Sequence, residues 1–184
     1  MIIRRGLKED SEQIAEYLLL AMEEIAYRFI GKQDKQLALE FLTDLVKEEG
    51  NQYSYNHNWV IEENGTVVAT ALVYDGANLY ELRKPVADLV ENKYQRSFNP
   101  EDETQAGEFY IDCIAVNPNQ QGKGLGSIII KYLIDEYILK KKAVLGLLVD
   151  EDNPKAKKLY ERLGFKVVGM KSLMGKNLEH MQLK

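Results

Sequence analysis

The sequence predicts a mixed α/β domain, and two patterns support that prediction. A strand over residues 109–116, a helix over residues 124–140 and a strand over residues 143–149 follow one another, which is the order of a right-handed parallel βαβ unit. Upstream, two short runs rich in β-branched and aromatic residues flank a turn, which predicts an antiparallel hairpin. A chain of 184 residues is long enough for one domain with its own core, without a stabilising metal or disulfide.

The N-terminal part is predicted to be a short strand followed by two helices. Residues 1–5 are extended and end in a turn through Gly6. Asp10 and Ser11 are candidate N-caps of a helix with apolar residues at helical spacing, namely Ile14, Leu18, Met22 and Ile25. Gly50 ends a second predicted helix over residues 34–49, which carries an apolar stripe of Leu37, Phe41, Leu42 and Leu45.

The next segment predicts a β-hairpin. Residues 59–61 and 66–74 read as strands because they are dominated by β-branched, aromatic and other apolar residues. The turn between them contains Glu63, Asn64 and Gly65, and the last two tolerate the positive φ that tight hairpin turns require. The two strands are therefore expected to pair antiparallel.

Residues 76–107 show no clean periodicity. Residues 79–94 are compatible with one helix or with two helices broken at Pro85, and residues 95–107 are polar and contain Asn99-Pro100. A stretch of this length between a hairpin and a strong strand indicates an insertion, and long irregular connections in compact domains are often functional lids. We therefore expect the 76–107 insertion to lie on the substrate side of the domain.

The C-terminal part is predicted to hold one helix and two strands. Asn153 is a candidate N-cap, Pro154 suits the first helical position, and Gly164 stands where a left-handed residue ends a helix. The buried stripe of this helix consists of Ala156, Leu159, Tyr160 and Leu163. Residues 166–173 and 180–183 are predicted strands, and a loop over residues 174–179 joins them.

Composition and charge disfavour several classes of protein. The 29 acidic and 24 basic residues give a net charge of −5, and no dense basic stripe suits nucleic-acid binding. No apolar run approaches the ~20 residues of a membrane span, and Arg4 and Arg5 interrupt any signal peptide. Cys113 is the single cysteine, so we expect a cytoplasmic protein without an internal disulfide. His57 and His180 lie far apart in the sequence, which disfavours a metal site.

A glycine-rich loop is the clearest chemical signal in the chain. Residues 121–127 follow a predicted strand and open a predicted helix, with the sequence Gln121-Gly122-Lys123-Gly124-Leu125-Gly126-Ser127. Three alternating glycines leave backbone N–H groups uncovered, and the helix dipole adds positive potential there, so the loop can bind a phosphate. The glycines are equally compatible with a tight strand-to-helix turn that binds no ligand.

Two widespread phosphate loops fit these residues poorly. The P-loop has four residues between its first glycine and a Gly-Lys pair followed by Ser or Thr, whereas Gly124 is followed by Leu125. The dinucleotide-binding fingerprint has its third glycine one residue later, where Ser127 stands. A nucleotide-binding α/β domain is therefore disfavoured.

Two segments together resemble one known family. The spacing Gln121-x-x-Gly124-x-Gly126, preceded by residues 114–118 (Ile-Ala-Val-Asn-Pro), is similar to the pyrophosphate loop of the GNAT superfamily of acyl-CoA-dependent N-acyltransferases. Residues 153–165 resemble the second hallmark segment of that family, through Asn153-Pro154, Tyr160-Glu161 and Leu163-Gly164-Phe165. The clear resemblance covers about residues 110–168, and the 76–107 insertion has no counterpart in it.

This resemblance implies a single N-acetyltransferase domain over residues 1–184, with a twisted mixed sheet of about seven strands and helices on both faces. The strands at 109–116 and 143–149 would be central parallel neighbours that splay apart at their C-terminal ends. That gap would admit the pantetheine arm of acetyl-CoA beside the backbone of Ile114, Ala115 and Val116. The pyrophosphate would bind the N–H groups of Gln121, Gly122, Lys123, Gly124, Leu125, Gly126 and Ser127. Asn153 would lie beside the coenzyme while capping its helix.

The resemblance also implies that a primary amine attacks the thioester directly in a ternary complex. Tyr160 is then the candidate acid that protonates the leaving thiolate, although it also fits the buried stripe of its helix. Asp112 is a charged residue inside an apolar strand, at a position where some members of the family carry a base. It is expected to act as the base, to clamp the substrate or to be a buried structural acid.

Strict alternation along the 109–116 strand assigns its residues to two faces. Asp112 shares one face with Tyr110, Ile114 and Val116, and Glu108 has the same parity. Cys113 falls on the opposite face and is interpreted as a small core residue turned away from Asp112.

We therefore expect an acyl-CoA N-acyltransferase that uses acetyl-CoA as co-substrate and no metal. Its acceptor would be a primary amine of a small molecule, peptide or protein, selected by the N-terminal helices, the 76–107 insertion and the loop at 174–179. A non-catalytic module that binds or senses acyl-CoA is the alternative, with the glycine loop but without a competent acid and base. Neither nucleic acid nor a membrane is an expected partner. Members of this family often form homodimers, and no residue here decides for or against one.

Overall fold

The computed structural model describes residues 1–184 and confirms a mixed sheet of seven strands, in the order β1-β2-β3-β4-β5-β7-β6. Only the central pair β4 and β5 is parallel. The strands are β1 (Ile2–Arg5), β2 (Asn58–Glu63), β3 (Thr66–Asp75), β4 (Phe109–Val116), β5 (Leu145–Asp150), β6 (Lys166–Leu173) and β7 (Lys176–Leu183).

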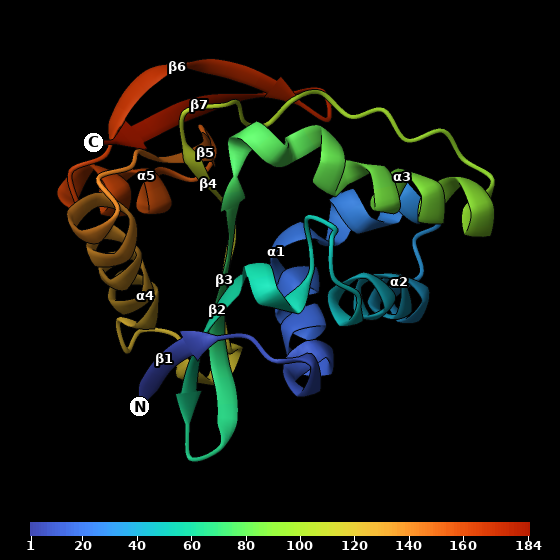
Figure 1. Cartoon of the computed structure of the whole chain (residues 1–184), viewed down its shortest axis with the longest axis horizontal. Coiled ribbons are helices and arrows are strands. Elements are labelled where there is room, and N and C mark those ends of the chain that lie inside the picture. The colour runs from blue at the N-terminus through green and yellow to red at the C-terminus, as the bar shows by residue number, and fades with distance from the viewer.

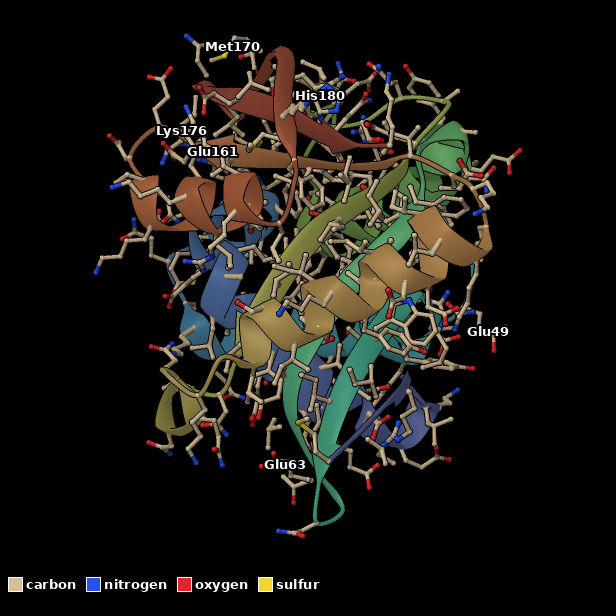
Figure 2. The ribbon with its side chains drawn as sticks, turned by 90° about the vertical axis from the view of Figure 1, so that its left-hand side faces the viewer. Glu49, Glu63, Glu161, Met170, Lys176 and His180 are labelled. Carbon is tan, nitrogen blue, oxygen red and sulfur yellow. The ribbon has the colours of Figure 1, made fainter.

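Five α-helices cover the two faces of this sheet. α1 (Ser11–Ile30), α2 (Lys35–Lys47) and α3 (Leu79–Tyr94) lie on one side, and α4 (Leu125–Leu133) and α5 (Pro154–Arg162) lie on the other (Figure 1). Figure 2 shows α4 crossing the strands and Met170 pointing outward from the edge strand β6. None of the helices combines the length and apolar character that crossing a membrane requires. Short 3₁₀ turns occupy Lys8–Asp10, Tyr55–His57, Gly76–Asn78 and Pro118–Gln120.

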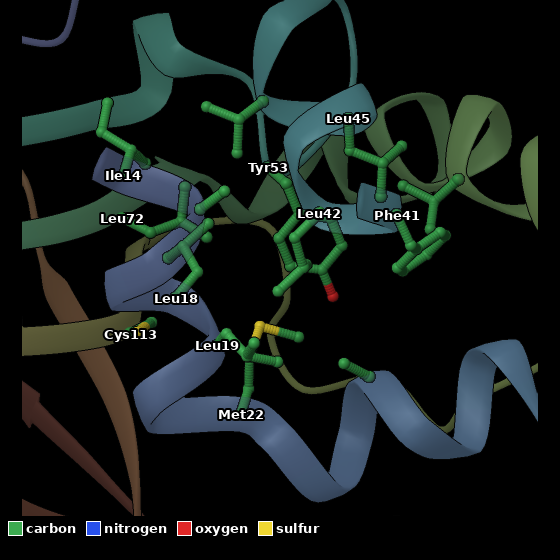
Figure 3. Packing of buried hydrophobic residues seen from close by; sticks show 14 of the residues in the cluster. Ile14, Leu18, Leu19, Met22, Phe41, Leu42, Leu45, Tyr53, Leu72 and Cys113 are labelled. Carbon is green, nitrogen blue, oxygen red and sulfur yellow. The ribbon is translucent and has the colours of Figure 1, made fainter. Parts of the chain in front are cut away.

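Each face of the sheet has its own apolar core. The core under α1, α2 and α3 includes Leu18, Phe41 and Leu72, and Figure 3 shows part of its packing. The core under α4 and α5 includes Ile129 and Phe165. Both cores receive side chains from β4, because successive side chains of a strand point to opposite faces.

A β-bulge at Asp112 interrupts that alternation. Along β3, Leu72 pairs with Cys113 and Val73 pairs with Ile111, so Asp112 has no partner. An extra residue of this kind shifts all following side chains to the other face. Residues 110, 113 and 115 therefore pack under α1, whereas residues 111, 114 and 116 pack under α4. The predicted faces are wrong beyond Asp112, because they assumed an uninterrupted strand.

The predicted splay between the two parallel strands is confirmed. β4 and β5 pair only at residues 109–111 with residues 145–147. From Cys113 onward β4 pairs with β3 alone, and from Leu148 onward β5 pairs with β7 alone. A fork therefore opens between the two strands at the bulge.

Of the two alternatives for residues 79–94, the structure has the single helix, which runs through Pro85, since buried Leu82, Val86 and Val90 hold its inner face against the core. Two other predicted boundaries differ from the structure. The helix after the glycine loop is α-helical only to Leu133 and continues as π-helical turns over Ile134–Lys140. The loop predicted at residues 174–179 is wrong, because Met174 and Gly175 adopt positive φ in a tight turn and β7 begins immediately afterwards.

A buried carboxylate connects three segments at the start of β4. Glu108 accepts hydrogen bonds from Thr104 Oγ1 (2.8 Å) and Gln182 Nε2 (2.7 Å), and its Oε2 lies 2.8 Å from His180 Nε2. Burial raises the pKa of Glu108, but these three partners outweigh it and hold the pKa below its usual value. Glu108 therefore anchors the end of the 76–107 insertion to β4 and β7.

Gly146 of β5 is the position where this anchor leaves no room for a side chain. A Cβ atom there would lie 2.0 Å from Glu108 Oε2. We expect Gly146→Ala to lower the free energy of unfolding by about 1–3 kcal/mol, because the carboxylate would be displaced from its partners. Urea unfolding at neutral pH measures this change. Gly169→Ala in β6 is the control, because an added Cβ there would meet no atom within 4 Å. This change should shift the free energy of unfolding by less than about 0.5 kcal/mol. Equal losses in both variants would contradict the packing account.

Candidate functional site

A cavity of about 520 Å³ lies at the fork between β4 and β5. Its lining comes from α1, the segment before β2, the 76–107 insertion, the two splayed strands and the β6–β7 hairpin. Segments far apart in the sequence therefore meet here, and a volume of this size accommodates a small organic molecule.

The bend in α1 forms part of one wall. Met22 has φ −131° and ψ 30°, which interrupts the helix in its middle. Figure 3 shows Met22 at this bend, with the hydroxyl of Tyr53 turned toward it. Met22 and Tyr53 both line the cavity, together with Cys113 of β4. The bulge thus brings Asp112 and Cys113 to the same cavity, contrary to the predicted faces.

The floor of the cavity is polar and carries two carboxylates. Asp112 projects from the bulge, and Glu103 comes from the 76–107 insertion and is 5% exposed. The Gln52 amide lies between them, with Nε2 3.3 Å from Glu103 Oε1 and 3.5 Å from Asp112 Oδ2. Glu103 Oε1 also accepts a hydrogen bond from Tyr74 (2.9 Å).

Arg83 of α3 is the cation of this floor, and its two terminal nitrogens are engaged by residues 100–103 of the insertion. Its guanidinium binds the carboxylate of Glu103 and lies 2.9 Å from Asp102 Oδ1. It also donates to the backbone carbonyls of Pro100 (3.2 Å) and Glu101 (3.1 Å). Arg83 therefore balances Glu103, and Asp112 forms no ion pair within the protein.

The surroundings of Asp112 change its acidity strongly. Burial and, after it, the neighbouring Glu103 carboxylate raise its pKa to about 7, although the hydrogen bond from Gln52 acts in the opposite direction. A carboxyl group with a pKa near neutrality can take up and release a proton at physiological pH.

The glycine loop leaves a row of backbone donors free. The first hydrogen bond inside α4 runs from the Ile128 N–H to the carbonyl oxygen of Gly124 (3.0 Å), and the N–H groups of residues 122–127 bind no acceptor in the protein. A Cβ at Gly122, Gly124 or Gly126 would meet no atom within 4 Å, and the first two adopt positive φ. The predicted loop is therefore open at the positive end of the α4 dipole, where an anion can approach.

The structure arranges the other predicted residues around the same fork. Ile114, Ala115 and Val116 lie on β4 beyond the last pair with β5. Gln121 and Lys123 are exposed in the loop, and Leu125 and Ser127 lie in the first turn of α4.

Asn153 precedes α5, the helix after β5, and Tyr160 lies within it. Asn153 caps the helix as predicted, because its Oδ1 accepts a hydrogen bond from the Ala156 N–H (3.2 Å). Tyr160 packs edge-on against Phe165, with ring centroids 6.0 Å apart. Burial, with a smaller effect of Cys113, raises the pKa of Tyr160 to about 12, so its hydroxyl stays protonated at neutral pH.

Sequence reasoning missed three residues of the floor, namely Gln52, Arg83 and Glu103. Gln52 lies in a turn, and the other two lie in the insertion, where no periodic pattern separates buried from exposed positions. The nearest available signal concerns Arg83. This basic residue follows Leu82 directly and lies three positions before Val86, and both of these apolar residues are on the inner side of α3.

Comparisons with known proteins agree with this geometry. The chain matches the model of the acetyltransferase (GNAT) family over residues 32–165. A solved acetyltransferase structure is 29% identical, with a TM-score of 0.83 and coverage of 100% of this chain and 99% of that one. An N-acetyltransferase from Staphylococcus aureus Mu50 has a TM-score of 0.85 at 20% identity and covers 100% of both chains. A Salmonella typhimurium structure solved with its cofactor acetyl-CoA has a TM-score of 0.56 at 21% identity, with 100% of this chain and 93% of that one covered.

A shorter match links the chain to a protein of characterised activity. The ribosomal protein bS18-alanine N-acetyltransferase of Escherichia coli K12 is 46% identical over 52 residues, which are 28% of this chain and 35% of that enzyme. The match thus spans about a third of the length of the curated relatives. The family model, in contrast, covers most of the chain and includes the fork, the glycine loop and α5. On these grounds the chain belongs to the GNAT family of acetyltransferases.

Proposed function

We propose that this protein transfers an acetyl group from acetyl-CoA to a primary amine. The observation that carries the proposal is the fork between β4 and β5, which opens beside a glycine loop whose amide groups have no partner. A fork accommodates an extended arm, and free N–H groups at a helix N-terminus bind an anion. Acetyl-CoA has both parts, a pantetheine arm and a pyrophosphate.

The donor site uses backbone groups for the most part. The pyrophosphate would bind the free N–H groups of residues 122–127, beside Gln121, whose own N–H donates to the carbonyl of Pro118. The pantetheine arm would lie along Ile114, Ala115 and Val116, where β4 has no neighbour on one edge. Asn153 would border the coenzyme from the start of α5. Because most of these contacts come from the backbone, the binding mode depends on glycine conformation more than on particular side chains.

The acceptor amine would bind in the cavity, with the 76–107 insertion covering the substrate side as a lid. Arg83, Phe98 and Glu103 of this insertion line the cavity, which supports that role. The bS18-alanine N-acetyltransferase acts on an alanine of a ribosomal protein, as its name states, and amine acceptors also occur on small molecules and peptides.

The reaction needs one proton acceptor and one proton donor. The amine must lose a proton as its nitrogen attacks the thioester carbonyl, and Asp112, with its pKa near neutrality, is the base in this proposal. A backbone N–H of β4 near Ala115 would stabilise the tetrahedral oxyanion. As the C–S bond breaks, Tyr160 would donate its proton to the thiolate, so that the products are the N-acetyl amine and free coenzyme A.

The first experiment tests the donor and the reaction together. We expect the melting temperature to rise with acetyl-CoA and coenzyme A but not with NAD or ATP. Only the two coenzyme A species have both a pantetheine arm for the fork and a pyrophosphate for the loop. Thiol release with a panel of amines, including a peptide with an N-terminal alanine, then reports turnover. Stabilisation without thiol release for any amine would favour a non-catalytic acyl-CoA-binding module. No stabilisation by either coenzyme A species would end the proposal.

Tyr160→Phe tests the acid. We expect the change to lower kcat by about 10²-fold while the Kd for coenzyme A changes less than threefold, because the ring still packs against Phe165. Thiol-release kinetics and calorimetric titration measure the two quantities. Tyr132→Phe, near the C-terminal end of α4 and beside Trp59, is a matched control that should leave both unchanged. Full turnover in Tyr160→Phe would assign that residue a packing role alone.

Asp112 predicts the pH dependence. A base acts only when ionised, so kcat/KM should rise with pH through an inflection near 7. Glu103→Gln removes one cause of the raised pKa and should move that inflection below 7, whereas Asp112→Asn should abolish it and lower kcat by about 10²–10⁴-fold. The ionisation of the amine is common to all variants and cancels in the comparison. An unchanged profile in Asp112→Asn would exclude this residue as the base.

A further inference from the structure

We propose that the hydroxyls of Tyr53 and Tyr110, together with Asp112, bind the three N–H groups of a primary ammonium in the cavity. This inference rests on the proposed acetyl transfer and specifies how the acceptor nitrogen is recognised. Two observations carry it: both hydroxyls open into the cavity without a partner in the protein, and the carboxylate in the same cavity has no cation.

The first observation concerns the two tyrosines. Tyr53 is 3% exposed and Tyr110 is 2% exposed, and both line the cavity. Tyr53 follows Gln52 of the floor directly, and Tyr110 lies two residues before Asp112 on β4. Figure 3 shows the Tyr53 hydroxyl turned toward Met22, which belongs to the same lining. The two rings are therefore buried beside the floor.

Neither hydroxyl has a use inside the protein. The hydrogen bonds of Tyr53 involve only its backbone N–H and carbonyl groups, and those of Tyr110 belong to the strand ladder of β4. Neither hydroxyl oxygen is among the buried polar atoms that are sealed from solvent without a partner, so both keep surface in the cavity. A buried tyrosine hydroxyl normally has a partner, and two that face one cavity point to a ligand.

Tyr74 shows the contrasting case of a structural hydroxyl. Its ring lies edge-on to that of Tyr110, with centroids 5.8 Å apart, but its hydroxyl donates to Glu103 Oε1 (2.9 Å). Glu103 thus has a donor in Tyr74 and a cation in Arg83. The hydroxyls of the two cavity tyrosines are left for another partner.

The second observation is the charge in the cavity. Asp112 lines it and forms no salt bridge in the protein. Burial first, and then the carboxylates of Asp112 and Glu103, raise the pKa of the Tyr53 and Tyr110 hydroxyls, so both stay neutral at physiological pH. A cationic ligand would pair with Asp112, because buried carboxylates are normally paired.

A primary ammonium matches these three groups. It has three N–H donors and no acceptor, and the cavity offers it one carboxylate and two hydroxyl oxygens. When Asp112 takes up one proton, the two hydroxyls still hold the nitrogen, and its new lone pair faces the fork, which opens at Asp112. The ammonium form of a secondary amine has only two N–H groups and would leave one of the three acceptors unpaired.

The rim of the cavity sets a looser requirement on the rest of the acceptor. Glu23 and Glu24 of α1 line it without a cation, and Arg28 lines it without a carboxylate while donating to the Met174 carbonyl (2.6 Å). Groups of either charge can therefore lie at the rim. Recognition of the nitrogen by the three inner groups is compatible with tails of different chemistry.

Calorimetric titration in the presence of coenzyme A tests the nitrogen site without turnover. The probes are butylamine, 2-phenylethylamine, 1,6-diaminohexane and a peptide with an N-terminal alanine, each beside a derivative with one methyl group on every primary nitrogen. We expect the tightest-binding primary amine to lose at least about tenfold in affinity on methylation, because one charged hydrogen bond is missing. No binding by any of the four, or equal binding of the methylated forms, would overturn the inference.

Tyr53→Phe and Tyr110→Phe each remove one acceptor and keep the ring. Each should weaken the tightest-binding primary amine about tenfold and reduce its advantage over the methylated form to below about threefold, since only two acceptors remain. Tyr132→Phe, beside Trp59, is the control and should change neither quantity. Equal losses for the primary and the methylated amine would assign these tyrosines a packing role and contradict the proposal.

The melting temperature of the unliganded variants checks that the hydroxyls are free. Tyr53→Phe and Tyr110→Phe should stay within about 1 °C of the wild type or exceed it, because no bond inside the protein is lost. Tyr17→Phe should melt about 2–4 °C lower, because the Tyr17 hydroxyl donates to the Val67 carbonyl (2.7 Å). A fall in Tyr53→Phe as large as that in Tyr17→Phe would mean that the Tyr53 hydroxyl has a partner in the protein, which would overturn its assignment.

Thiol release with the same amines separates the two proposals. Binding that is weakened by methylation and by both tyrosine variants, without thiol release for any amine, would keep the nitrogen site and refute acetyl transfer. Thiol release whose kcat/KM is the same in the wild type, Tyr53→Phe and Tyr110→Phe would keep acetyl transfer and refute the nitrogen site.

Discussion

One extra residue in β4 determines where the site forms. The bulge at Asp112 falls at the point where β4 stops pairing with β5, so the fork and the change of side-chain faces share a single origin. Without it, strict alternation would turn Ile114 under α1 and move Cys113 to the α4 side. With it, Asp112 and Cys113 both reach the cavity, and the edge of β4 beyond them has no strand beside it.

The polar floor is costly for folding, and the insertion reduces that cost. Two carboxylates on a half-buried floor repel each other, and Arg83 offsets one of them from α3. Buried Tyr74 and Gln52 both donate hydrogen bonds to Glu103 Oε1, yet Gln52 Oε1 and Arg83 Nε have no hydrogen-bond partner. An arrangement that leaves such groups unpaired stabilises the fold poorly by itself and is better suited to a ligand that completes it.

The open glycine loop and the cap of α5 could be predicted from the sequence, whereas the polar floor of the cavity could not. The glycine loop and Asn153 act through backbone conformation and a helix cap, and both leave local signatures in the chain. The bulge leaves none, because a single unpaired residue is visible only once β3 is aligned with β4. Gln52 and Glu103 are distant in sequence and become neighbours only through the packing of α3 and residues 95–107, which has no periodicity to reveal it.

This asymmetry has a physical cause that bears on specificity. A pyrophosphate is recognised by N–H groups that every residue carries, so the loop constrains glycine positions and tolerates variation around them. The cavity, in contrast, is lined by side chains, and these come from α1, the turn at Gln52, the insertion and the β6–β7 hairpin. Each of these segments can change without disturbing the fork, because β4 and β5 are held by β3 and β7. The same scaffold can therefore keep one donor while its acceptor changes with the residues of the wall and floor.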